Sequence, residues 1–240
     1  MPKNSKILLF KTSAELARAA AGIFRDSCKS AVALRGLFTV ALSGGKTPAA
    51  LYSTLASPPF KDAVPWKNAH LFWGDERRCS PDDKDSNYRA AFVNLISKIA
   101  IPMDNVHRIQ GELDPVTAAS IYEEELKAFF GSAACPVFDL VLLGLGADGH
   151  TLSVFPSLAA HGKQERLVTA NKDPAGLWRV SMTLKMVNNA SKAVFLVSGA
   201  KKARILKDVL DGKGGFPATH VDLANGELIW MADKEAAGLL

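Results

Sequence analysis

The sequence predicts an α/β protein with a doubly wound, mostly parallel sheet and helices on both faces. Two observations lead to this prediction. Apolar strand-like runs alternate with helical patterns from one end of the chain to the other, which is the alternation that builds a parallel sheet. The run at residues 137–143 is almost continuously apolar, as expected for a central strand buried on both faces.

Seven runs have the length and composition of strands. They are short, and they are separated by polar, glycine-containing or helical stretches. They lie at residues 7–10, 37–42, 69–73, 137–143, 180–184, 193–198 and 227–231.

Five stretches between these strands have helical periodicity. Ser13 is expected to cap the first helix, because a serine hydroxyl can accept from free N–H groups of the first turn. Pro48 suits the first turn of the second helix, where its missing N–H costs nothing. The predicted helices lie at residues 14–29, 48–56, 87–99, 115–130 and 201–210.

The composition indicates a globular protein with an anionic ligand. The 240 residues are 48% hydrophobic and 22% charged, with a net charge of +5, so the chain can bury a sizeable core. A basic balance suits an anion, and nucleic acid is the usual alternative. Only Lys201, Lys202 and Arg204 form a dense basic group, and no aromatic and basic platform accompanies it. A small anion such as a sugar phosphate is therefore favoured over nucleic acid.

Cysteine usage and the first residues bear on location. Cys28, Cys79 and Cys135 are odd in number and far apart, which predicts reduced thiols in a cytosol-like compartment. The apolar run at residues 7–10 is too short for a signal-peptide core or a membrane span. We expect a cytoplasmic protein with no membrane attachment, and an organellar fraction is the alternative. We expect one domain over residues 1–240 and a monomer, since neither a long linker nor surplus apolar surface is visible.

The strand at residues 137–143 is followed by Gly-Leu-Gly-Ala-Asp-Gly-His-Thr. His150 thus lies just beyond the carboxyl end of a central strand, where open α/β sheets bind ligands, and it can act as a general base near neutral pH. A metal site at Asp148 and His150 is the minority interpretation, because no third ligand has suitable spacing. Four other histidines lack such a setting and are expected to be structural or surface residues: His70, His107, His161 and His220.

A second candidate loop, Ser-Gly-Gly-Lys-Thr-Pro at residues 43–48, joins a strand to a helix. Gly44 and Gly45 can present backbone N–H groups to a phosphate at the start of the helix. Lys46 adds a cation, and Thr47 can cap the helix. The spacing matches neither a Walker loop nor a dinucleotide fingerprint. The alternative is an ordinary tight turn.

Charged side chains follow two further strands. Asp75 can orient a substrate hydroxyl or support a base, and Arg77 offers paired donors that suit phosphate or an oxyanion. Arg179 stands beside the strand at residues 180–184, and Lys202 opens a helix. A cation at a helix start opposes the macrodipole unless an anion is bound there. The alternative for each is a solvated charged face.

Taken together, these segments resemble the 6-phosphogluconolactonase family, which belongs with the glucosamine-6-phosphate deaminase/isomerase group. The resemblance extends over residues 10–231, includes Ser-Asn-Tyr at residues 86–88, and is most specific in Asp-Gly-His-Thr with the trailing Val-Phe-Pro. It implies a Rossmann-like sheet. It also implies hydrolysis of 6-phospho-D-glucono-1,5-lactone to 6-phospho-D-gluconate, the second step of the oxidative pentose phosphate pathway. No redox cofactor is needed for ester hydrolysis.

For this reaction we hypothesise that His150 is the base that activates water, with Asp75 or Asp148 holding the imidazole or a sugar hydroxyl. The division of the binding residues between phosphate and oxyanion stays open. The deaminases carry a Glu shortly after the His and Asp-Glu-Tyr near Asp75, and this chain has neither. A deaminase and a non-catalytic sugar-phosphate sensor remain the alternatives. The residues expected to bind substrate are Ser43, Gly44, Gly45, Lys46, Thr47, Arg77, Gly146, Arg179 and Lys202.

Overall fold

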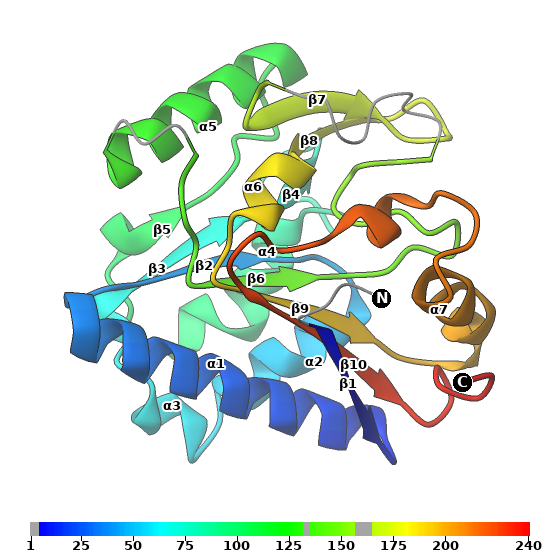
Figure 1. Ribbon diagram of the computed structural model, residues 1–240. Coiled ribbons are helices and arrows are strands. Elements are labelled where there is room, and N and C mark those ends of the chain that lie inside the picture. Colours follow the sequence, from blue (N-terminus) through cyan, green and yellow to red (C-terminus); the bar gives the residue numbers. More distant parts are fainter. Residues whose placement is uncertain (1–4, 132–134, 157–164) are drawn as a thin grey trace.

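The computed structural model describes residues 5–131, 135–156 and 165–240. Within them, the main sheet has the strand order β1-β10-β9-β6-β2-β3-β5, and all neighbouring strands are parallel (Figure 1). The predicted α/β class and parallel sheet are confirmed. The strands are β1 (Ser5–Phe10), β2 (Phe38–Leu42), β3 (Ala69–Trp73), β5 (Val106–His107), β6 (Leu140–Leu143), β9 (Lys192–Val197) and β10 (Glu227–Asp233).

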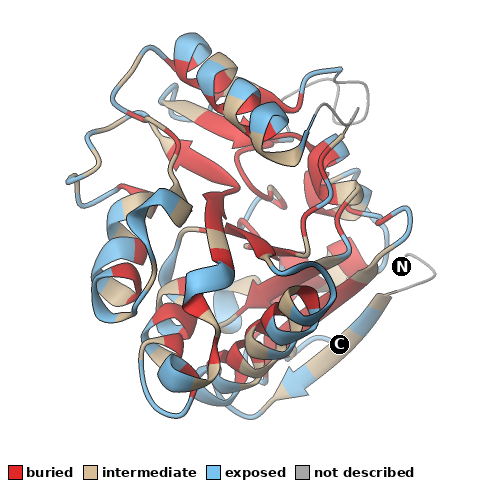
Figure 2. Ribbon diagram, turned by 90° about the vertical axis from the view of Figure 1, so that its left-hand side faces the viewer, coloured by how far each residue is buried: buried red, intermediate tan, exposed pale blue. Residues whose placement is uncertain are grey.

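The strand order creates a switch point between β2 and β6. After β2 the chain moves outward through β3 to β5, and it then returns to the other side of β2 as β6, β9 and β10. Every residue of β2 and β6 is buried, and buried strands run through the middle of the molecule in Figure 2. The loops leaving β2 and β6 therefore diverge at their carboxyl ends, which is where α/β sheets form ligand crevices.

Helices cover both sides of this sheet. α1 lies along one side with α2 and α3, whereas α5 lies on the opposite side (Figure 1). No helix among the described residues is both long and apolar enough to cross a lipid bilayer. The helices are α1 (Ser13–Arg35), α2 (Lys46–Leu55), α3 (Phe60–Ala63), α4 (Asn87–Asn94), α5 (Pro115–Phe130), α6 (Leu184–Asn188) and α7 (Ala203–Leu210). Single 3₁₀ turns occur at η1 (Trp66–Asn68), η2 (Ile96–Lys98), η3 (Met103–Asn105), η4 (Ala200–Lys202) and η5 (Pro217–His220).

A second, antiparallel sheet was not predicted in full. Its order is β4 (Asp75–Arg77), β8 (Trp178–Met182) and β7 (Val168–Lys172). The strands β4 and β7 escaped sequence reasoning because they are short and rich in polar residues. Gly74 links the two sheets: its N–H donates to the carbonyl of Leu42 (2.9 Å) and its carbonyl accepts from the N–H of Met182 (2.8 Å). The small sheet is thus held over the carboxyl end of β2.

Two predicted helix starts are wrong. Thr12, not Ser13, caps α1, because Thr12 is extended and its Oγ1 accepts from the N–H of Glu15 (3.1 Å). α2 begins at Lys46, and Gly45 occupies the N-cap position without any side-chain bond. Thr47 therefore lies inside the helix and does not cap it. Gly45 has a φ of 101°, which residues with side chains rarely adopt, so a glycine suits this position.

Other element ends shift by a few residues. The predicted helix at 87–99 ends at Asn94 and continues as the 3₁₀ turn η2. The predicted helix at 201–210 starts with η4, so that α7 begins only at Ala203. The strand predicted at 180–184 is β8 and ends at Met182, because Leu184 already begins α6. Its strand character agrees with the prediction, but β8 belongs to the small antiparallel sheet and not to the parallel one.

Candidate active site

Two cavities open where the loops after β2, β3 and β6 meet. One of about 260 Å³ is lined by the loops that follow β2 and β6, together with Lys202. The other, of about 460 Å³, extends toward β7 and β8 and includes Arg179. Asp75, Arg77 and His150 line both. The sequence-predicted residues from four separate segments thus converge at the switch point.

His150 is oriented by Asp148 of its own turn. Oδ1 of Asp148 lies 2.5 Å from Nδ1 of His150 and also accepts from the His150 N–H (3.3 Å). The ring of Phe155 packs at a tilt against the imidazole, with centroids 4.8 Å apart. A carboxylate at Nδ1 favours the tautomer that is protonated there and leaves Nε2 to accept a proton. The geometry suits a general base.

The pKa of Asp148 lies below its usual value. Partial burial acts to raise it, but the nearby His150, through its charge and hydrogen bonds, outweighs burial. Asp148 therefore remains a carboxylate, the form that can hold an imidazolium. Lys202 shows the opposite balance, because burial lowers the pKa of its ammonium although Asp148 acts to raise it.

Gly146 provides the room that this pair needs. The N–H of Gly146 donates to the carbonyl of His150 (2.8 Å), which closes the turn. A Cβ at Gly146 would lie 2.1 Å from Nδ1 of His150 and 2.5 Å from Oδ1 of Asp148. No side chain fits at such distances, so a glycine is required here for the imidazole and carboxylate to meet.

Asp75 does not hold the imidazole. Its Oδ2 accepts from the hydroxyl of Ser153 (2.6 Å), and its Oδ1 accepts from Nδ2 of Asn87 (3.3 Å). The residue is only 8% exposed, yet it lines both cavities. Of the two carboxylates that the sequence offered as partners of His150, the structure brings Asp148 to the ring and leaves Asp75 to face the cavities.

Glu76 fixes the segment on the other side of Asp75. Its buried carboxylate accepts from the N–H groups of Asn87 and Tyr88 (both 2.8 Å) and from the hydroxyl of Ser86 (3.0 Å). Burial raises the pKa of Glu76, although the N–H donors lower it in part. These bonds cap α4 and hold Asn87 against Asp75. A carboxylate at the start of a helix is favourable for the same electrostatic reason that an external anion would be.

The loop after β2 is held by Tyr52. The Tyr52 hydroxyl accepts from the N–H of Ser43 (3.1 Å) and donates to its carbonyl (2.6 Å). A Cβ at Gly44 would lie 1.8 Å from Oδ1 of Asn87, so the loop passes too close for any side chain. Ser43, Gly44 and Gly45 line the smaller cavity. Lys46 and Thr47 line neither this cavity nor the larger one, and both residues lie within α2.

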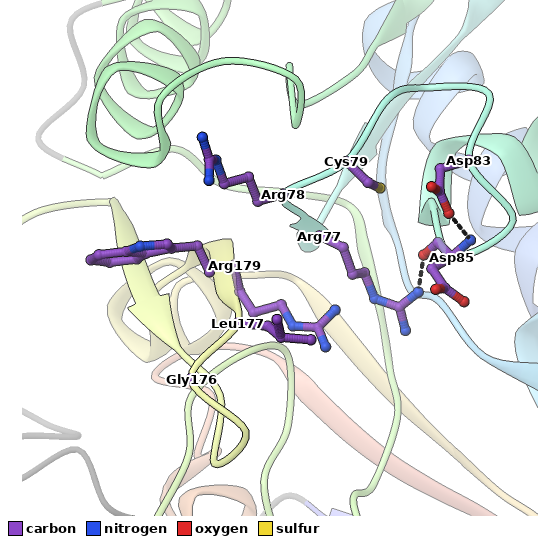
Figure 3. Close-up of a pocket in the computed structure, with 9 residues that line it drawn as sticks. Arg77, Arg78, Cys79, Asp83, Asp85, Gly176, Leu177 and Arg179 are labelled. Atoms are coloured by element: carbon purple, nitrogen blue, oxygen red, sulfur yellow. Dashed lines mark hydrogen bonds between the residues drawn. The ribbon is translucent and has the colours of Figure 1, made fainter.

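Arg77 and Arg179 lie directly opposite each other on the paired strands β4 and β8. Nη1 of Arg77 donates a hydrogen bond to the carbonyl of Asp85. Nε and Nη2 of Arg179 donate to Oδ2 of Asp173 (3.2 and 2.6 Å). Figure 3 shows both guanidinium groups pointing into the same space. Two adjacent cations of this kind provide a suitable environment for an anion.

A third cavity of about 590 Å³ is lined by these two arginines and also by Arg78 and Trp178 (Figure 3). We call it the outer cavity, and the two cavities that contain His150 are the inner cavities. Arg78 points away from the Arg77 and Arg179 pair in Figure 3. The three cavities share Arg77, which therefore stands at their junction.

Sequence reasoning missed several residues of the site. Asn87 was visible only as part of Ser-Asn-Tyr, and Ser153 only as part of the segment after His150. Leu152 lines both inner cavities, and Asp173 lines the larger one. Asp173 carries no recognisable sequence signal, because its partner Arg179 lies across a hairpin that was not predicted.

The other histidines that the structure describes do not line these cavities. Nδ1 of His70 is 3.1 Å from Nε2 of His107, and Nδ1 of His107 is 2.8 Å from Oε1 of Glu125. This chain of groups links β3 and β5 to α5, which agrees with a structural role. His220 lies in η5, and His161 lies outside the described residues. Within the described ranges, no three His, Cys, Asp or Glu side chains are grouped so that they could hold a metal ion.

Comparison with known proteins identifies the class. Residues 11–230 match the family described as glucosamine-6-phosphate isomerases/6-phosphogluconolactonase. The chain belongs to this family.

Particular relatives narrow the class further. The chain is 43% identical over 213 residues to the 6-phosphogluconolactonase of a Synechocystis species, covering 86% of each protein. It is 39% identical over 204 residues to that of Aggregatibacter actinomycetemcomitans, covering 84% of this chain and 87% of the relative. The solved 6-phosphogluconolactonase from Trypanosoma cruzi is 28% identical, with a TM-score of 0.87 and coverage of 100% of this chain and 98% of that one. These relatives are 6-phosphogluconolactonases, which are hydrolases. The chain is therefore an enzyme of the hydrolase class.

Proposed function

We propose that this enzyme hydrolyses 6-phospho-D-glucono-1,5-lactone to 6-phospho-D-gluconate, the second step of the oxidative pentose phosphate pathway. The observation that carries the proposal is the pair of Asp148 and His150 in a cavity with cations on its walls. The names of the relatives support the same substrate.

In the proposed mechanism, Nε2 of neutral His150 takes a proton from a water molecule as the water oxygen attacks C1 of the lactone. The C1 carbonyl becomes an oxyanion in a tetrahedral intermediate. When the carbonyl reforms, the bond between C1 and the ring oxygen breaks. The imidazolium then returns its proton to the departing ring oxygen, and the acid product ionises. General-base assistance of this kind contributes ~10²–10⁴ in rate.

Asp148 stabilises the imidazolium in this scheme, because its carboxylate is fixed at Nδ1. Asp75 is assigned to orient a substrate hydroxyl or the attacking water, since it lines both cavities and has no bond to the imidazole. The reaction transfers no electrons, so the proposal includes no redox cofactor.

The binding residues fall into two groups. Arg77 and Arg179 lie side by side and supply the donors that suit the dianionic phosphate. Backbone N–H groups of the glycine loops and Lys202 line the smaller cavity together with His150, and we assign them to the oxyanion. One oxyanion donor is worth roughly 3 kcal/mol in the transition state. We assign no role to Lys46 and Thr47, because neither residue lines these cavities.

A glucosamine-6-phosphate deaminase is the second candidate. A solved monomeric deaminase has the same fold, with a TM-score of 0.81 at 20% identity. The segment from Thr151 to Phe155 has no carboxylate, so the group that assists ring opening in deaminases is missing from that position. A cytoplasmic location, a monomeric state and a single domain over 1–240 remain predictions. Relatives from rice are named chloroplastic, which keeps the organellar alternative in view.

A coupled assay tests the proposal. The lactone is generated in situ from glucose 6-phosphate, and its loss is followed against the spontaneous background. We expect faster loss with wild type and background loss with His150→Ala, while 6-phosphogluconate still binds the variant. Background loss with wild type would reject the lactonase, and ammonia release from glucosamine 6-phosphate would then test the deaminase. Near-normal turnover by His150→Ala would remove His150 from the mechanism.

A further inference from the structure

Ser153 uses all of its polar groups to join the His150 loop to the small sheet. Its N–H donates to Oγ of Ser181 on β8 (3.1 Å), and its carbonyl accepts from Nδ2 of Asn171 on β7 (2.8 Å). Its hydroxyl donates to Oδ2 of Asp75 on β4 (2.6 Å). All four residues are buried. The loop is therefore anchored to each strand of the small sheet through one residue.

The neighbouring Leu152 sets the direction of this contact. Leu152 has a φ of 54°, in the left-handed region that residues with side chains rarely adopt. The turn is closed by the N–H of Val154, which donates to the carbonyl of Thr151 (3.0 Å). The Leu152 side chain lies against Gly74, where a Cβ would come within 2.7 Å of it. Consecutive residues of the loop, Leu152 and Ser153, thus meet consecutive residues Gly74 and Asp75.

The Asp75 carboxylate depends on neutral donors for its orientation. Ser153 and Asn87 each donate to one of its oxygens, at 2.6 and 3.3 Å, and no ion pair within the described part of the chain includes Asp75. The shorter bond comes from the segment that directly follows His150. A buried carboxylate held in this way cannot rotate without losing a charge-assisted hydrogen bond.

We propose that Ser153 is a positioning residue, whose hydroxyl holds the Asp75 carboxylate in place relative to His150 so that both act on one substrate. The inference rests on the proposed function, because Asp75 and His150 have their roles there. Ser153 lines the larger cavity but is only 2% exposed, and its hydroxyl is donated to Asp75, so it acts through that carboxylate. It links the base on the β6 loop to the carboxylate on the β4 strand, which come from different sheets.

The test is a double-mutant cycle of Ser153→Ala and Asp75→Ala, measured as kcat and KM in the coupled assay. We expect Ser153→Ala to lower kcat on the order of 10–100-fold, with a smaller change in KM, because a hydrogen bond to a charged group is lost. In the Asp75→Ala background the same change should cost little further activity. Ser153→Cys keeps a weaker donor in a similar volume and should fall between wild type and Ser153→Ala.

Ser181→Ala and Asn171→Ala are matched controls. Each removes one bond of Ser153 to the small sheet and leaves its hydroxyl bond to Asp75. A merely structural role predicts that these controls lose as much kcat as Ser153→Ala at equal thermal stability. That result would overturn the proposal, as would full turnover by Asp75→Ala or effects that multiply in the double variant.

The same cycle measured by calorimetric affinity for 6-phosphogluconate does not depend on turnover. If wild type gave only background hydrolysis while this cycle remained non-additive, the lactonase function would fail and the coupling of Ser153 to Asp75 would stand. An additive cycle in kcat, with active wild type, would reject the coupling and leave the function intact. An additive cycle in the affinity measurement, with inactive wild type, would reject both.

Discussion

Asp148 and His150 form a hydrogen-bonded pair within a single turn, with 2.5 Å between Oδ1 and Nδ1. The acceptor and the ring thus come from residues two positions apart, whereas Asp75 arrives from another sheet and does not contact the ring. The orientation of the base is therefore determined locally, by the turn after β6. The position of Asp75 is determined by tertiary contacts.

Asp148→Asn should leave the fold intact and lower turnover by ~10²–10⁴-fold, because an amide stabilises neither the required tautomer nor the imidazolium. The loss should not exceed that of His150→Ala, since Asp148 acts through the imidazole. Steady-state rates of the two single variants and of the double variant give the answer. Multiplying losses would show that Asp148 has a separate role.

Gly146→Ala should reduce activity strongly, because its Cβ would lie 2.1 Å from Nδ1 of His150. A matched control is Gly22→Ala, where nothing lies within 4 Å of the added Cβ. Gly22 is inside α1, so the control should stabilise the protein by roughly 0.5–1 kcal/mol. Turnover and thermal unfolding are measured for both. Equal turnover in the two variants would contradict the steric argument.

Arg179→Ala should mainly raise KM, by on the order of 10–100-fold if one charged hydrogen-bonded contact to phosphate is lost. Arg78→Ala is the control, because Arg78 lines only the outer cavity. Its KM should stay close to that of wild type. An unchanged KM for Arg179→Ala would place Arg179 outside the phosphate site, and a rise in both variants would indicate general electrostatic attraction instead.

Glu123 of α5 contributes to the pH dependence of stability at acid pH. Its carboxylate accepts from Lys127 Nζ (2.6 Å) and Arg166 Nε (2.8 Å) and from the N–H groups of Leu167 and Val168. Burial acts to raise its pKa, but these donors outweigh burial and lower it from 4.5 to about 2. The folded state therefore favours the ionised form. This contribution to stability is complete above about 4.5 and is lost as pH falls toward 2.

Glu123→Gln should lower the free energy of unfolding by about 1–3 kcal/mol at neutral pH. It should also flatten the fall in stability between pH 4.5 and pH 2, because in that range the Glu123 carboxylate of wild type takes up a proton on unfolding. Urea unfolding at a series of pH values measures both effects. If the difference in unfolding free energy between wild type and variant stayed constant down to pH 2, Glu123 would not titrate in that range.

The parallel sheet was predictable because buried strands leave a continuous apolar pattern, as in β2 and β6. Glycines directly after such strands also marked the loops that meet at the site. Capping was less predictable, because Thr12 and Ser13 both carry a hydroxyl and only the extended backbone of Thr12 decides between them. Lys46 and Thr47 were predicted to precede the helix for a related reason, and they lie within α2, which starts earlier than Pro48 suggests.

The contacts that orient Asp75 could not be read from sequence. They depend on the small antiparallel sheet, whose strands β4 and β7 lack an apolar pattern. Asn87 lies 12 residues and Ser153 lies 78 residues from Asp75 in the chain, and neither separation is one that helix or strand periodicity relates to it. The choice of Asp148 over Asp75 as the partner of His150 likewise required the turn geometry.

The pairing of β1 with β10 has a consequence for how the chain folds during synthesis. Ser5 lies opposite Leu228, and β1 has no other neighbour in the described sheet. Among the described strands, β1 precedes all the others in the chain and β10 follows them, so β1 cannot take its native partner until β10 has been synthesised. Until then its backbone donors and acceptors are satisfied only by water or by transient partners. The β1 edge of the sheet can therefore form only after translation of β10.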